Sequence, residues 1–124
     1  MTAKRRKAQR GSVMVEMALV LPILLLLVIG GIDLDLMVTA KSALNYVAGE
    51  AARCGAQVPG CSPSASAMNQ APGLGLKAAN VNVTLGPCGP ALSNPCTVTV
   101  TYLWAPISPF FKSTTLTSIA TAQP

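Results

Sequence analysis

The sequence contains no histidine and only four acidic residues among its 124 positions. Histidine is the side chain that proteins use most often for general acid–base catalysis, and it is also a common metal ligand. The acids Glu16, Asp33, Asp35 and Glu50 are spread along one predicted helix, with no paired nucleophile, phosphate-binding glycine loop or Ser/Lys arrangement. We therefore expect no enzymatic activity, no cofactor and no small-molecule substrate.

Aromatic residues are also scarce, at 4% of the sequence. Tyr46, Tyr102 and Trp104 lie in segments with periodic apolar residues. Such aromatics most often belong to a core or to a membrane-interface belt. We interpret them in that way rather than as a binding platform.

Four cysteines are present, without any CxxC pair. A structural zinc site needs Cys and His ligands at close spacing, so a zinc site is disfavoured and no metal is expected. Among the connectivities that four cysteines allow, we favour the local one, Cys54–Cys61 with Cys88–Cys96. Both intervening segments contain the Pro and Gly that let a chain turn back. Disulfides form in oxidising compartments, which predicts that this part of the chain is exported.

The basic residues are concentrated at the beginning of the chain. Five of the nine are Lys4, Arg5, Arg6, Lys7 and Arg10. A basic run can bind nucleic acid or serve as a nuclear address, but directly before an apolar span it more often keeps the N-terminus in the cytoplasm. We therefore interpret residues 1–11 as a basic cytoplasmic leader, which we expect to be disordered, and we expect no nucleic-acid partner.

The apolar run at residues 12–32 is predicted to form a transmembrane helix. About twenty residues at ~1.5 Å each cover ~30 Å, the thickness of a hydrocarbon core. Pro22 removes one backbone hydrogen bond inside it, which membrane helices tolerate. Apolar residues then recur every three or four positions through residues 33–54, so we predict that the helix continues as an amphipathic segment to about Ala52. On its polar side, Glu50 and Arg53 are spaced to pair weakly.

The remaining residues predict a small β module. Residues 55–79 are rich in Gly, Pro, Ser and Ala, which indicates a loop. Within residues 80–122, NVNVTL and TVTVTYLW alternate apolar and polar positions, and STTLTSIATA is rich in β-branched residues. The predicted fold class is α+β: a long N-terminal transmembrane and stalk helix, followed by a disulfide-bearing antiparallel module of about three strands. The apolar stripe of the helix from Leu36 to Ala51 would cover the sheet.

The start of the apolar run carries a processing pattern. A basic segment, Gly11, the neutral Ser12, three further uncharged residues and Glu16 precede the long apolar helix. This arrangement resembles a class III, type IV prepilin signal. The resemblance implies that a membrane-embedded prepilin peptidase cuts between Gly11 and Ser12, which makes Glu16 the fifth residue of the mature chain.

A closer resemblance covers two blocks of the sequence. GSVMVEMALVLPILLLLVIGGIDL with KSALNYVAGEAARCGA, and TVTVTYLWAPISPFF with LTSIATA, resemble the TadE-like proteins of tight-adherence (Tad/Flp) pilus systems. Met17 stands where that family usually has an aromatic residue, and Ser12 stands where type IV pilins often have Phe. The resemblance implies a minor pilin or pseudopilin of the bacterial inner membrane, with a periplasmic C-terminal module. Its implied partners are the membrane, prepilin peptidase, other pilins and the pilus assembly machinery, with incorporation into a surface pilus as a further expectation.

Glu16 requires an explanation, because an ionised group near the bilayer centre costs about 2.5–3.5 kcal/mol on insertion scales and less near the interface. Cleavage would create an α-amino group at Ser12, whose usual pKa of about 7.7–8.0 leaves it largely protonated at neutral pH. In an apolar assembly this amine can pair with Glu16 of a neighbouring subunit, which offsets the desolvation of both charges. We therefore interpret Glu16 as an assembly residue.

Two alternatives stay open. The chain could be an uncleaved single-pass anchor carrying a small exported domain of another function, with Glu16 tolerated near the interface. It could also carry a secretory signal cut after Ala40, although its apolar run exceeds the usual 7–15 residues, and Asp33 and Asp35 precede that site.

Overall fold

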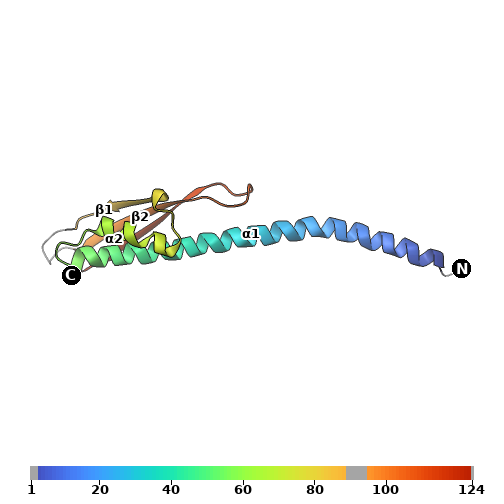
Figure 1. The fold of residues 1–124 in the computed structure, drawn as a ribbon, viewed down its shortest axis with the longest axis horizontal. Coiled ribbons are helices and arrows are strands. Elements are labelled where there is room, and N and C mark those ends of the chain that lie inside the picture. The colour runs from blue at the N-terminus through green and yellow to red at the C-terminus, as the bar shows by residue number, and fades with distance from the viewer. Residues whose placement is uncertain (1–2, 89–94, 124) are drawn as a thin grey trace. The chain divides into compact units, whose positions relative to one another are not determined.

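The computed structural model describes residues 3–88 and 95–123, with the backbone alone for residues 3–12. Figure 1 shows the elements in chain order. They are the helix α1 (Ala3–Gln57), the helix α2 (Pro63–Gln70), the 3-10 turns η1 (Pro72–Leu74) and η2 (Ala78–Asn80), and the strands β1 (Val81–Leu85), β2 (Cys96–Trp104) and β3 (Thr114–Ala122). The chain divides into two compact units, Met1–Leu34 and Asp35–Pro124, with the boundary inside α1.

Helix α1 is longer than the sequence pattern predicts. It begins at Ala3, so the leader that we expected to be disordered is helical from that residue onward. Ala, Lys, Arg and Gln are all strong helix formers, and the segment contains no proline to interrupt them. The helix also runs through Pro22 and continues to Gln57, beyond the predicted end near Ala52. Pro59 follows within two residues, and its missing N–H prevents the helix from continuing.

The three predicted strands form one antiparallel sheet in the order β1-β2-β3. Strand β2 is central, with Val83 opposite Val100 on one side and Tyr102 opposite Leu116 on the other. Its side chains alternate in burial, so that Val98, Val100, Tyr102 and Trp104 point into the core. The prediction of three antiparallel strands is confirmed.

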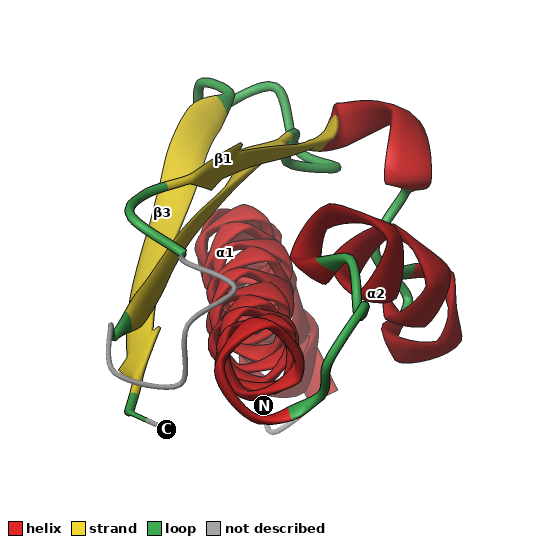
Figure 2. Ribbon diagram, turned by 90° about the vertical axis from the view of Figure 1, so that its left-hand side faces the viewer, coloured by secondary structure: helices red, strands yellow, loops and turns green. Residues whose placement is uncertain are grey.

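Helix α1 covers the buried face of this sheet, as predicted. Figure 2 shows the sheet lying over one side of α1, with α2 beside it. Leu44, Val47, Ala48 and Ala51 are fully buried in one cluster with the inward side chains of β2. Burial of one Leu or Val side chain stabilises a fold by about 1.5–3 kcal/mol. The predicted stripe begins later than expected, because Leu36 is 40% exposed.

The segment 55–79, expected to be a loop, contains α2 and both 3-10 turns. Pro63 occupies the first turn of α2, where its missing N–H costs nothing. Ala67 and Ala71 are fully buried in the core cluster. The small residues that suggested a loop in fact let a short helix pack closely against the rest of the unit.

Candidate functional site

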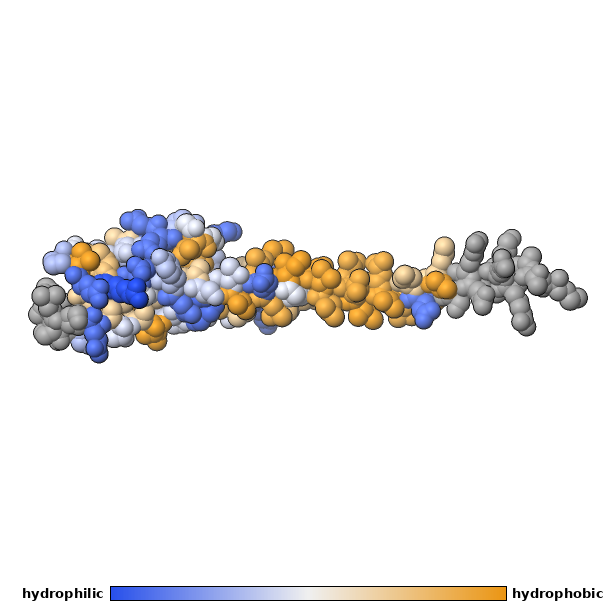
Figure 3. Space-filling view, turned by 90° about the horizontal axis from the view of Figure 1, so that it is seen from below, coloured by the Kyte–Doolittle hydropathy of each residue, from blue (hydrophilic) through white to orange (hydrophobic). Residues whose placement is uncertain are grey.

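The surface of α1 from Val13 to Ile32, here called the apolar segment, is the first candidate site. Its large apolar side chains are all exposed, from 42% at Ile29 to 77% at Met14. Figure 3 shows one face of the helix, on which most of the surface of this segment is hydrophobic. The helix from Val13 onward is long and apolar enough to cross a membrane. Such a surface is stable only in lipid or against other apolar helices.

Glu16 interrupts this surface near its beginning. Its side chain is exposed, and among the side chains that the structure describes, none forms a hydrogen bond or ion pair with it. Ser12 lies four residues earlier on the same helix, a rise of about 6 Å or roughly one turn. The carboxylate is therefore accessible to a group from another molecule.

The predicted cleavage site Gly11–Ser12 lies within α1. Glycine costs about 1 kcal/mol relative to alanine inside a helix, so Gly11 is a local weak point in the leader. The side chains of Ser12 and of the basic residues Lys4, Arg5, Arg6, Lys7 and Arg10 lie outside the described part of the structure. Their predicted roles in cleavage and topology therefore stay predictions.

Two glycines open the helix surface near the end of the apolar segment. A Cβ atom added at Gly30 or at Gly31 would meet nothing within 4 Å. Small residues at such positions let the backbones of neighbouring membrane helices approach closely. A neighbouring helix can therefore pack closely against α1 at Gly30 and Gly31.

The other acids differ from Glu16. Glu50 Oε1 accepts a hydrogen bond from Arg53 Nη1 at 3.4 Å, which confirms the predicted surface pair. Asp35 is exposed, whereas Asp33 is 1% exposed. The burial of Asp33 is not predicted by the sequence pattern, in which it marks only the end of the apolar run.

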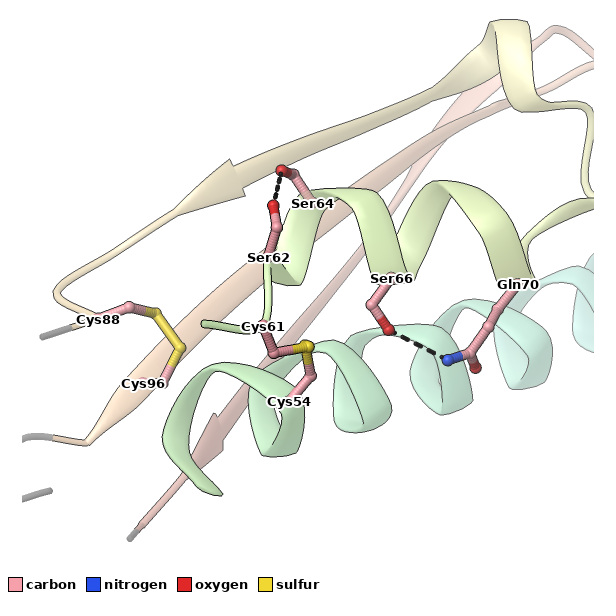
Figure 4. Close-up of a disulfide and its surroundings, with 8 residues drawn as sticks. All are labelled: Cys54, Cys61, Ser62, Ser64, Ser66, Gln70, Cys88 and Cys96. Atoms are coloured by element: carbon pink, nitrogen blue, oxygen red, sulfur yellow. Dashed lines mark hydrogen bonds between the residues drawn. A yellow bond between two sulfur atoms is a disulfide. The ribbon is translucent and has the colours of Figure 1, made fainter. Parts of the chain in front are cut away.

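The cysteines form the local pairs that we favoured. Cys54–Cys61 joins the end of α1 to the segment before α2, with 5.6 Å between the Cα atoms. Cys88–Cys96 closes the connection between β1 and β2, with a Cα separation of 4.2 Å. Figure 4 shows both disulfides at the same end of the unit, close to the last turns of α1.

Gly55 lies between these disulfides at a close approach that the sequence does not reveal. A Cβ atom there would be 2.6 Å from Cys96 Sγ and 2.7 Å from Pro63 Cγ. No side chain fits in that space without a shift of its neighbours. Gly55 therefore allows the end of α1 to pack directly on the Cys88–Cys96 disulfide.

Comparison with known protein families gives a match in the first part of the chain. The model of the TadE-like protein family matches residues 11–53. Comparison with curated proteins and with solved structures gives no significant match. The matched region begins at Gly11 and includes Glu16, the apolar segment and most of the helix face that covers the sheet. The chain is therefore similar to TadE-like proteins over residues 11–53, which supports the first block of the resemblance found in its sequence, while the match does not reach the C-terminal block.

Proposed function

We propose that the protein is a minor pilin or pseudopilin of a Tad/Flp-type pilus, and that prepilin peptidase cuts it between Gly11 and Ser12. It acts in pilus assembly and surface adhesion through packing of α1 and not through catalysis. The observation that carries this proposal is the TadE-like match, which starts at Gly11 and includes the whole exposed apolar segment.

In this mechanism the surroundings of the apolar segment change when the protein leaves the membrane and joins a fibre. Lipid surrounds it in the inner membrane, and the apolar segments of neighbouring subunits surround it in a fibre. Lipid tails are as apolar as leucine, so the exchange gains little from hydrophobicity and depends on close packing and polar pairing. Gly30 and Gly31 provide space for close packing.

Glu16 supplies the polar pairing. The Ser12 amine of one subunit pairs with Glu16 of the next and fixes the register between them. A carboxylate that stays unpaired destabilises an apolar assembly strongly, because no opposite charge then offsets the free-energy cost of removing it from water. Subunits out of register would leave this charge buried and unpaired.

A major pilin of this class is little more than its helix, whereas this chain adds the unit Asp35–Pro124 with two disulfides. This difference favours a minor pilin or pseudopilin that initiates, primes or caps a fibre. The disulfides also support an orientation with the N-terminus in the cytoplasm and this unit in the oxidising periplasm.

Of the alternatives, the uncleaved anchor explains the apolar segment but gives Glu16 no role. A secretory signal cut after Ala40 would divide α1 in mid-helix. It would also remove Met37 and Ala40, which pack against the core of the Asp35–Pro124 unit.

Mass spectrometry of the membrane-extracted protein from its native host tests the proposal. We expect a chain that starts at Ser12. A start at Met1 or Thr2 would instead support the anchor, and a start at Lys41 the secretory signal. A Gly11→Leu variant should keep the leader, while the matched Ala8→Leu variant should still be cut. Co-purification with sheared surface fibres then separates a fibre component from an assembly factor that stays in the membrane.

A further inference from the structure

The connection between β2 and β3, residues 105–113, exposes large apolar side chains outside the apolar segment. Ile107 is 77% exposed, Phe110 67% and Phe111 43%. Both phenylalanines of the sequence lie here, followed directly by the exposed Lys112. Exposed apolar groups concentrated in this way mark a surface that contacts a partner or a membrane.

The position of this connection within the unit Asp35–Pro124 follows from the contacts between β3 and α1. Lys41 Nζ donates a hydrogen bond to the carbonyl oxygen of Thr117. Ser118 Oγ donates one to Asn45 Oδ1 at 2.7 Å. Strand β3 and helix α1 therefore run in the same direction along this contact.

Strand β3 and the part of α1 that belongs to this unit, from Asp35 onward, also begin at about the same level. Counting back from Lys41, Asp35 lies about 9 Å earlier along the helix, at ~1.5 Å per residue. Counting back from Thr117, the first residue of β3, Thr114, lies about 10 Å earlier, at ~3.3 Å per residue. The connection 105–113 thus leaves the sheet at the end of the unit where α1 enters it. The disulfides lie at the opposite end, where Cys96 pairs with Ala122.

We propose that residues 105–113 contact the lipid surface of the membrane that α1 spans, with Ile107, Phe110 and Phe111 in the interfacial layer and Lys112 among the head groups. This inference rests on the proposed function only in requiring that α1 crosses a membrane. The apolar segment ends at Ile32, so the head-group layer begins close to Asp33 and Asp35. The connection 105–113 leaves the sheet at this same level along α1.

The chemistry of the connection fits this partner. Phenylalanine is one of the apolar side chains with which peripheral segments insert at the boundary between head groups and acyl chains, and lysine extends its charge toward anionic head groups. Pro106 and Pro109 restrict the backbone, which lowers the entropy lost when the apolar side chains are held in lipid. A second protein is the weaker candidate, because a stable interface covers about 800 Å² on each partner, far more than three side chains provide.

Fluorescence quenching by brominated lipids tests the contact in full-length protein reconstituted into phosphatidylcholine vesicles, with and without phosphatidylglycerol. Trp104 is the single tryptophan of the sequence, so Phe110→Trp is measured in a Trp104→Phe background. The same substitution is also measured with Trp104 retained, in case the background variant does not fold. Ile119→Trp is the matched control, because Ile119 is also 67% exposed but lies further along β3. Ile29→Trp, within the apolar segment, reports whether α1 spans the bilayer.

We expect quenching at Phe110→Trp several-fold stronger than at Ile119→Trp, together with strong quenching at Ile29→Trp. Equal, weak quenching at positions 110 and 119, with Ile29→Trp still quenched, would overturn the lipid contact and leave the proposed function intact. Weak quenching at Ile29→Trp would instead contradict the membrane span itself. Weak quenching at Phe110→Trp together with a blue-shifted emission that moves to the red on dilution of protein into excess lipid would show contact between copies, and would also overturn the proposal.

Discussion

Two stretches of α1 have the same secondary structure and opposite surroundings. From Val13 to Ile32 the large apolar side chains are exposed around the whole helix. From Leu44 to Ala56 one face is buried against the sheet and α2. The second stretch obtains its partner from its own chain, whereas the first has to find lipid or another subunit. Among the residues that the structure describes, the apolar segment thus differs from the second stretch in having no side chains packed over it.

The largest effect that distinguishes these stretches should come from truncating one leucine in each. Leu44→Ala removes a fully buried side chain and should lower the free energy of unfolding by about 2–5 kcal/mol. Leu26→Ala, at a position that is 55% exposed, should leave it unchanged. Urea unfolding in detergent, followed by the fluorescence of the buried Trp104, measures both. A similar loss for Leu26→Ala would show that the apolar segment contributes to the folding of the other unit.

Replacing one glycine in each stretch by alanine should change the free energy of unfolding by a smaller amount than the leucine truncation. Gly55→Ala places a Cβ atom against Cys96 and Pro63, and such overpacking costs about 1–3 kcal/mol. Gly31→Ala meets open space and should cause no loss of stability. We expect it instead to weaken fibre incorporation, because the added methyl group holds neighbouring helices apart. The same unfolding measurement and a fibre-shearing assay check the two results, and a stable Gly55→Ala variant would contradict the close approach.

The smallest effect concerns Glu50, the acid of the buried stretch. Its partner Arg53 has a side chain that is 69% exposed, and exposed pairs contribute about 0–1 kcal/mol. Glu50→Ala should therefore change the free energy of unfolding by less than about 1 kcal/mol and leave fibre incorporation unaffected. This variant is the matched control for Glu16, and a loss of incorporation would show that any acid on α1 is required.

The sequence predicts most of the fold because its periodic patterns are strong. Alternating residues in β2 and the three- and four-residue spacing from Ala40 to Ala51 identify the sheet and the helix face that covers it. The local cysteine pairs follow from turn residues between them. These features are local, so they can be recognised without knowledge of the tertiary structure.

The features that the sequence does not predict depend on tertiary contacts or on weak signals. Helix α2 forms because Ala67 and Ala71 are buried, although its composition resembles that of a loop. The burial of Asp33 and the close approach at Gly55 have no periodic signal. For the candidate site, Gly11, Ser12 and Glu16 are recognisable by spacing, but the partners that we propose for them belong to other molecules.

The most direct test of the account is the incorporation of a Glu16→Ala variant into surface fibres. The variant should insert into the membrane and, like the unmodified chain, have Ser12 as its first residue, because Glu16 lies beyond the predicted cut. Its amount in sheared fibres should fall strongly, while Glu50→Ala is incorporated normally. Unchanged incorporation of Glu16→Ala would contradict the role of this acid in subunit register.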